Sequence, residues 1–203
     1  MPILELCAGY GGLGLAVEML TGDRVTHVAE IDPAASRVLA ERYPDAPNLG
    51  DITQIDWFAL AGEITTITAG FPCQDISIAG RGAGINGTRS GVWTHVADAI
   101  RAIRPDLVFL ENVANIRTRG MPDVLRALAE IGYDCRWCCY RASAVGAPHQ
   151  RDRWFCLAVP QNPNGKSWQQ WRGTAPAETY WEALSHSLSG GGEAARTCGH
   201  ARR

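Results

Sequence analysis

The first 160 residues alternate short apolar runs, typical of β-strands, with longer segments whose apolar spacing is typical of helices. The runs that predict strands are residues 2–7, 25–31, 64–69, 107–110, 133–141 and 154–159. The segments that predict helices are residues 13–20, 32–43, 90–103 and 121–131. Strands that alternate with helices of this length predict an α/β fold: a mostly parallel central sheet with helices on both faces.

Composition narrows the class of protein. With 203 residues, 46% of them hydrophobic and 20% charged, we expect one globular domain and no global disorder. The sequence has no apolar run long enough to span a bilayer, and it does not begin like a signal peptide. Its seven cysteines are an odd number without a secretion signal, which favours a reducing, cytoplasmic location.

The C-terminal part differs from the rest. Residues 161–203 are rich in Gln, Asn, Gly, Ser, Thr and Pro, and they predict a short, weakly ordered tail with one helix near residues 177–188. Residues 1–150 carry 12 basic and 17 acidic residues, whereas residues 151–203 carry 7 basic and 4 acidic ones. This basic bias is compatible with an edge that contacts nucleic acid. We therefore divide the chain into a domain, 1–160, and a tail, 161–203.

A glycine-rich turn follows the first predicted strand and leads directly into a helix. Glycines in such a turn let a ligand approach the backbone, and the helix start offers unpaired N–H groups. About 20 residues further on, Glu30 ends the next strand, where a carboxylate can bind a ribose. The alternative is a tight turn that binds no ligand. Candidate cofactor-binding residues in the turn are Cys7, Ala8, Gly9, Gly11, Gly12 and Leu13.

A cysteine follows the third predicted strand, within Gly70-Phe71-Pro72-Cys73-Gln74-Asp75-Ile76-Ser77. This position is the carboxyl edge of the sheet, where open α/β sheets bind their ligands. A thiolate there is a candidate nucleophile, although a packed cysteine is the commoner case. Residues 79–90 add four glycines and two arginines, Arg81 and Arg89, and so predict a mobile cationic loop suited to an anionic substrate.

Two further patterns point to the same edge. Glu111-Asn112-Val113 ends the fourth predicted strand, which places a carboxylate beside the cysteine loop. Arg151 and Arg153 alternate along an extended segment, so both side chains leave the same face and are suited to a phosphate or a carbonyl. Taken alone, each pattern could equally be a solvated charged edge.

In this order the four patterns resemble the cytosine-5 DNA methyltransferase family over residues 1–160. The resemblance implies a Rossmann-like fold that binds S-adenosyl-L-methionine. It implies that Cys73 is the catalytic nucleophile, that Glu111 is the catalytic acid, and that Arg151 and Arg153 bind the substrate during catalysis. Cofactor contacts would come from the glycine turn together with Glu30, Ile31, Asp51, Ile52 and Pro72. Substrate contacts would come from Gln74, Ser77, Arg89, Asn112 and Val113.

The implied reaction transfers a methyl group to carbon 5 of a cytosine that is flipped out of double-stranded DNA, in a bacterial or phage-infected cell. Two departures from the family pattern occur in the first motif, which has Glu5 where Asp is usual and Cys7 where Phe is usual. A third is His149, which replaces a Gln before the arginine pair. The rival hypotheses are methylation of cytosine in transfer RNA, and an inactive, cofactor-binding subunit.

Residues 161–203 are too few for the target-recognition region and closing segment that full-length family members carry, so we expect an incomplete enzyme that a second chain completes. A zinc site is the weaker interpretation of Cys135 and Cys138, because no second paired motif accompanies them. We expect them to be small strand residues and predict no metal. The tail tryptophans Trp168, Trp171 and Trp181 could stack on bases, but packing is the preferred interpretation.

Overall fold

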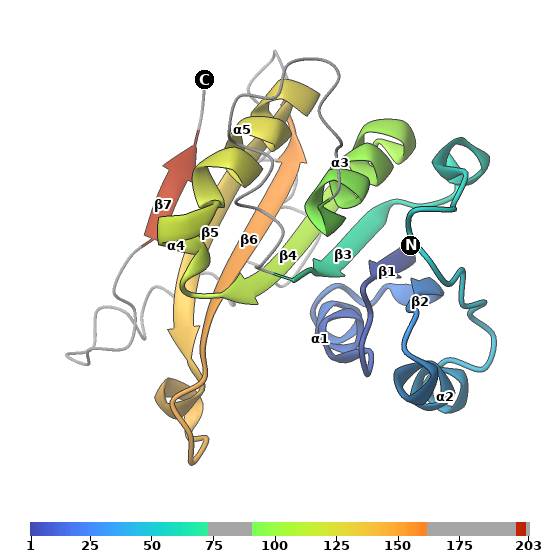
Figure 1. The fold of residues 1–203 in the computed structure, drawn as a ribbon, viewed down its shortest axis with the longest axis horizontal. Helices are drawn as coiled ribbons and strands as arrows, with labels where there is room; N and C mark the ends of the chain where they lie inside the picture. Colours follow the sequence, from blue (N-terminus) through green and yellow to red (C-terminus); the bar gives the residue numbers. More distant parts are fainter. Residues whose placement is uncertain (73–90, 162–197, 202–203) are drawn as a thin grey trace.

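The computed structural model describes residues 1–72, 91–161 and 198–201. A central sheet organises these residues, with the strand order β2-β1-β3-β4-β6-β5-β7 (Figure 1). The strands are β1 (Pro2–Leu6), β2 (Arg24–Ala29), β3 (Thr66–Gly70), β4 (Leu107–Val113), β5 (Tyr133–Arg141), β6 (Asp152–Pro160) and β7 (Cys198–Ala201).

The two halves of the sheet are paired differently. β1 pairs in parallel with β2 and β3, and β3 pairs in parallel with β4. β6 is antiparallel both to β4 and to β5, and β7 is antiparallel to β5. Strands β1 to β5 therefore all run in the same direction, which confirms the mostly parallel sheet expected from the sequence.

Helices cover both faces of the sheet, as predicted (Figure 1). They are α1 (Gly12–Thr21), α2 (Pro33–Arg42), α3 (Val92–Ile103), α4 (Ile116–Arg119) and α5 (Met121–Ile131). Side chains alternate along β1, so Leu4 and Leu6 join the core cluster that includes α3 and α5. Ile3 joins a second cluster, which contains Val17 of α1 and Leu39 of α2. The two clusters hold the sheet between its helix layers.

Local chemistry explains where α2 and α3 begin or end. Asp32 caps α2, because its carboxylate accepts hydrogen bonds from Ala34 N and Ala35 N, and Pro33 occupies the first turn as the sequence predicts. The end of α3 is Arg104, a non-glycine residue with φ of 57°. Its guanidinium contacts the ring of Tyr133 and donates to the Ile131 carbonyl, which supports this unusual conformation.

The structure adds elements that the sequence patterns did not predict. Short 3-10 helices occupy Trp57–Leu60 and Ala142–Val145, α4 is a single turn, and β7 lies within the predicted tail. The predicted helix near residues 177–188 lies outside the described residues, as do the three tail tryptophans. Within the described ranges, no helix combines the length and hydropathy that crossing a membrane requires.

Candidate cofactor and catalytic site

The turn between β1 and α1 has an unusual backbone. Cys7, Gly9 and Gly11 all have positive φ, at 52°, 55° and 77°. Gly11 N–H donates to the Ala8 carbonyl at 2.8 Å, and Ala8 N–H donates to the Ala29 carbonyl at 3.2 Å. These bonds fold the turn tightly over the ends of β1 and β2. A left-handed conformation at a non-glycine such as Cys7 is uncommon and often marks a functional site.

The turn leaves its backbone accessible at two positions. A Cβ atom added to Gly9 or Gly12 would have no atom within 4 Å, whereas one on Gly11 would meet the Tyr43 ring at 2.8 Å. Gly11 is therefore packed against the end of α2, and the Tyr43 hydroxyl donates to its carbonyl at 3.2 Å. The open surface at Gly9 and Gly12 fits a ligand that approaches the backbone closely.

Glu30 supports this turn directly. Its Oε2 accepts from Gly9 N–H at 2.7 Å, and its Oε1 accepts from Asp32 N–H at 2.8 Å. The backbone of Glu30 is held on both sides by Asn48, whose Oδ1 accepts from its N–H and whose Nδ2 donates to its carbonyl. The carboxylate predicted to bind a ribose thus lies at the turn and also shapes it. Sequence reasoning missed Asn48, because a single Asn in a loop carries no pattern.

The remaining predicted cofactor residues differ in exposure. Ile31 is 72% exposed, an unusual position for a large apolar side chain, and it follows Glu30 directly. Asp51 is exposed, and hydrogen bonds from the backbone and side chain of Thr53 lower the pKa of its carboxyl. Ile52 is 7% exposed and packs in the core cluster. Asp51 and Ile31 therefore offer surface to a ligand, whereas the side chain of Ile52 offers little.

Two of the described thiols, those of Cys7 and Cys156, are poor nucleophiles. Burial, and secondarily the negative charge of Glu30, raises the pKa of Cys7 to about 12. Burial among neighbouring cysteines also raises the pKa of Cys156 well above its usual range. Both thiols stay protonated at neutral pH, and a protonated thiol attacks weakly.

The pair Cys135 and Cys138, which the sequence predicts to be strand residues rather than zinc ligands, lies within strand β5. Cys135 and Cys138 are 2% and 6% exposed, which confirms that they are strand residues of the core.

The segment predicted to carry the nucleophile begins at the carboxyl end of β3. Phe71 is buried against Trp93, with ring centroids 5.0 Å apart, and Pro72 is exposed. The Asn112 side chain is buried at the end of β4, where its Nδ2 donates to the Phe71 carbonyl at 2.8 Å. This bond fixes the backbone two residues before Cys73. Cys73 itself, and the predicted substrate residues Gln74, Ser77 and Arg89, lie outside the described residues.

Glu111 and Arg153 meet at the same edge. Arg153 Nε lies 2.7 Å from Glu111 Oε1, and the two side chains are 21% and 24% exposed. Antiparallel pairing causes this contact, because it places the start of β6 beside the end of β4. Gly70 of β3 pairs with Glu111, and a Cβ on Gly70 would lie 3.6 Å from Glu111 Oε2. Glu111 therefore lies beside Gly70, which precedes Cys73 by three residues in the chain.

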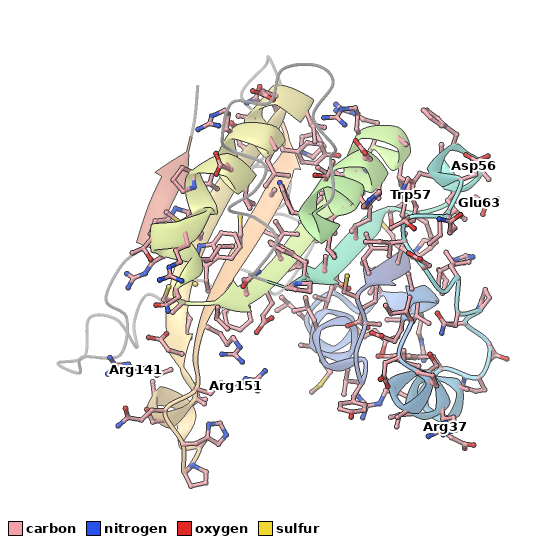
Figure 2. The ribbon with its side chains drawn as sticks, in the orientation of Figure 1. Arg37, Asp56, Trp57, Glu63, Arg141 and Arg151 are labelled. Carbon is pink, nitrogen blue, oxygen red and sulfur yellow. The ribbon has the colours of Figure 1, made fainter. Side chains whose placement is uncertain are left out.

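Arg151 and Val113 complete the group of predicted residues. Arg151 is exposed and lies just before β6, near the protruding end of the β5–β6 hairpin (Figure 2). Arg141 lies close by in the same view and pairs with Asp152 at 3.6 Å. Val113 is 36% exposed at the end of β4. The structure therefore brings Glu111 and Arg153 into contact, whereas Arg151 lies further out on the hairpin.

Comparison with known proteins identifies the family of this chain. The family model for C-5 cytosine-specific DNA methylase matches residues 1–188. The chain belongs to this family. The type II methyltransferase M.CviJI of Paramecium bursaria Chlorella virus IL3A is 38% identical over 159 residues, which are 77% of this chain and 42% of that protein. M1.ScrFI of Lactococcus lactis subsp. cremoris is 32% identical over 76% of this chain and 40% of its own length.

Solved structures agree with this chain at the level of the fold. A DNMT2 mutant from Spodoptera frugiperda matches with a TM-score of 0.65 and 23% identity, over 80% of this chain and 50% of that chain. S. pombe Dnmt2 matches with a TM-score of 0.64 and 20% identity, over 79% and 51%. The fold is therefore that of a Rossmann-like methyltransferase. The chain spans about half or less of the length of these proteins.

Proposed function

We propose that this chain is the catalytic half of a DNA methyltransferase that transfers a methyl group from S-adenosyl-L-methionine to carbon 5 of cytosine. The observation that carries the proposal is the Glu111–Arg153 pair at the carboxyl edge of the sheet, beside the strand that leads into Cys73. Membership of the C-5 cytosine-specific DNA methylase family, and two relatives that are type II methyltransferases, favour DNA as the substrate.

The β1–α1 turn fits the proposed cofactor. Gly9 and Gly12 expose backbone to a ligand, and Ile31 offers an apolar surface for an adenine ring. Each carboxylate oxygen of Glu30 accepts one backbone hydrogen bond, from Gly9 or Asp32, and has a further lone pair. These lone pairs would accept hydrogen bonds from the ribose hydroxyl groups. Asp51 stays ionised near neutral pH and can accept a hydrogen bond from the adenine amine. When bound, S-adenosyl-L-methionine would supply an electrophilic methyl group on a sulfonium.

Cys73 is the nucleophile in this proposal. Its thiolate adds to carbon 6 of the cytosine, which makes carbon 5 electron-rich enough to accept the methyl group. Loss of the carbon 5 proton and expulsion of the thiolate then restore the aromatic ring. The protonated state of Cys7 and Cys156 supports this choice, because neither thiol competes as a nucleophile.

Glu111 acts on the other side of the base. Its carboxyl group donates a proton or hydrogen bond to ring nitrogen 3, which offsets the negative charge that develops there when the thiolate adds. Arg153 fixes the orientation of this carboxyl through the 2.7 Å contact, and the rest of its guanidinium can bind the carbonyl of the base. Arg151, which is exposed at the hairpin, would bind a phosphate of the flipped nucleotide.

A second chain would supply target recognition. The two relatives are more than twice as long as the segment that matches this chain. The chain also has an exposed apolar surface that further protein could cover. The outward side of α1 presents Gly12, Leu15, Ala16 and Met19, all exposed, and Leu15 and Met19 are 40% and 80% exposed. A helix with apolar residues on its outward face is normally buried. We therefore propose that α1 is covered in the complete enzyme.

The test is transfer of tritiated methyl from S-adenosyl-L-methionine to duplex DNA, single-stranded DNA and transfer RNA. We expect transfer to duplex DNA, and we expect Cys73→Ala to abolish it while binding of S-adenosylhomocysteine by calorimetry persists. Cys138→Ala, which removes a buried thiol of β5, is the matched control and should retain transfer.

Each result discriminates among the alternatives. Methylation of transfer RNA alone would identify the RNA substrate. Cofactor binding without transfer to any substrate would identify an inactive half that needs its partner chain. Undiminished methylation by Cys73→Ala would contradict the covalent mechanism.

A further inference from the structure

Glu5 is a buried carboxyl group that the proposed mechanism does not use. It lies on β1 and is 2% exposed. Its Oε1 accepts a hydrogen bond from Gly14 N–H at 2.9 Å, whereas Oε2 is buried with no hydrogen-bond partner among the described residues. A carboxylate in this position requires an explanation, because burying a charge without full compensation is costly.

The contact lies in the first turn of α1. The first N–H groups of a helix have no partner within it, and a side chain normally supplies one. In α1 the capping position is Gly11, which has no side chain and makes no cap bond. Glu5, nine residues before Gly14 in the chain, supplies the missing acceptor for an N–H group at the start of the helix.

Gly14 makes room for this arrangement. A Cβ atom on residue 14 would lie 2.2 Å from Glu5 Oε2 and 2.9 Å from both Glu5 Cδ and Val25 Cγ2. Gly14 has no positive φ, so its backbone conformation does not require glycine. Ala would also be the better helix former by about 1 kcal/mol. The presence of glycine is therefore explained by the close approach of Glu5, with a smaller contribution from Val25.

We propose that Glu5 and Gly14 are a compensating pair in which Glu5 is a positioning residue that holds the start of α1, and with it the turn of residues 7–12, for the cofactor. The Glu5 carboxyl reaches the helix because residue 14 has no side chain. The proposal rests on the proposed function in that the ligand of this turn is taken to be S-adenosyl-L-methionine.

The test is a double-mutant cycle of Gly14→Ala and Glu5→Asp, with melting temperature and the Kd of S-adenosylhomocysteine as readouts. Gly14→Ala should lower the melting temperature and weaken binding about tenfold in protein that is still folded by circular dichroism. Glu5→Asp withdraws the carboxyl by one methylene, so Gly14→Ala in that background should be neutral or stabilising and should recover most of the affinity. Val25→Ala, the matched control, should rescue Gly14→Ala less than Glu5→Asp does.

Three outcomes would contradict the proposal that Glu5 and Gly14 compensate each other. The first is additive effects of the two substitutions. The second is better rescue by Val25→Ala. The third is a lower melting temperature with an unchanged Kd, which would leave Glu5 a structural role only. If the wild-type chain binds no S-adenosylhomocysteine, the proposed function fails instead, and the coupling in melting temperature still decides whether the two residues compensate.

Discussion

At the scale of the residue, Glu5 links folding to pH. Burial raises its pKa from 4.5 to about 7, and the bond from Gly14 and the charge of Arg42 only partly oppose this. The negative charge of Glu18 adds to this increase in the pKa of Glu5, and burial together with the charges of Glu5 and Glu18 raises the pKa of Tyr43 to about 12. The folded protein therefore binds the proton more tightly than the unfolded chain does. Stability from this group is complete below pH 4.5 and is lost as the pH rises to about 7.

We expect Glu5→Gln to remove this loss. Between pH 5 and pH 8, the free energy of unfolding of the wild type should fall relative to that of the variant by up to about 3 kcal/mol. Urea unfolding at several pH values measures the difference, and comparison of the two proteins cancels the other titrating groups. Parallel pH profiles would show that Glu5 does not titrate in this range.

Residues of the candidate site could be predicted where the order and spacing of sequence motifs identified them. Glu111 and Arg153 were assigned to one site from the order of their motifs, and the structure brings them into contact. Contacts that depend on packing were not predictable. Asn48 behind Glu30, and Tyr43 on the Gly11 carbonyl, come from a loop and a helix end whose positions only the folded chain defines.

At the scale of the element, Asn112 joins β4 to the segment that leaves β3. Asn112→Ala would leave the buried Phe71 carbonyl without its donor, which costs about 1–3 kcal/mol. We also expect a large loss of methyl transfer, because the backbone that leads into Cys73 loses its anchor. Chemical unfolding and the transfer assay measure the two effects. Asn115→Ala, at an exposed position without a side-chain cap bond, is the control and should change stability by less than about 0.5 kcal/mol.

The strands and long helices were predictable because burial imposes regular patterns on them. The apolar runs of β1 and β3 gave clear signals, as did the Asp-Pro start of α2. The single-turn elements Trp57–Leu60 and α4 were missed, since four residues are too few to show a period. The insertion of β6 between β4 and β5 was also not predicted, because strand order depends on contacts distant in sequence.

At the scale of the whole molecule, the exposed side of α1 predicts how the isolated chain behaves. Leu15→Glu with Met19→Glu should leave the melting temperature within a few degrees of wild type, because both side chains are exposed. The double variant should bind less of the dye ANS and should self-associate less in sedimentation experiments. Leu4→Glu, within the core, is the contrasting control and should unfold the protein. A large loss of stability in the double variant would show that this helix face is already covered.

The position of β6 also determines when the site forms during folding. β6 follows β5 in the chain but separates it from β4 in the sheet, so β5 reaches the parallel strands only through β6. This order predicts that the two strands dock together as a hairpin, a unit that forms within about 1–10 μs. Since Arg153 arrives with that hairpin, Glu111 gains its cation only at this late, long-range step. On the ribosome, a nascent chain shorter than about 160 residues would hold a glycine turn ready for cofactor but no assembled acid–cation pair.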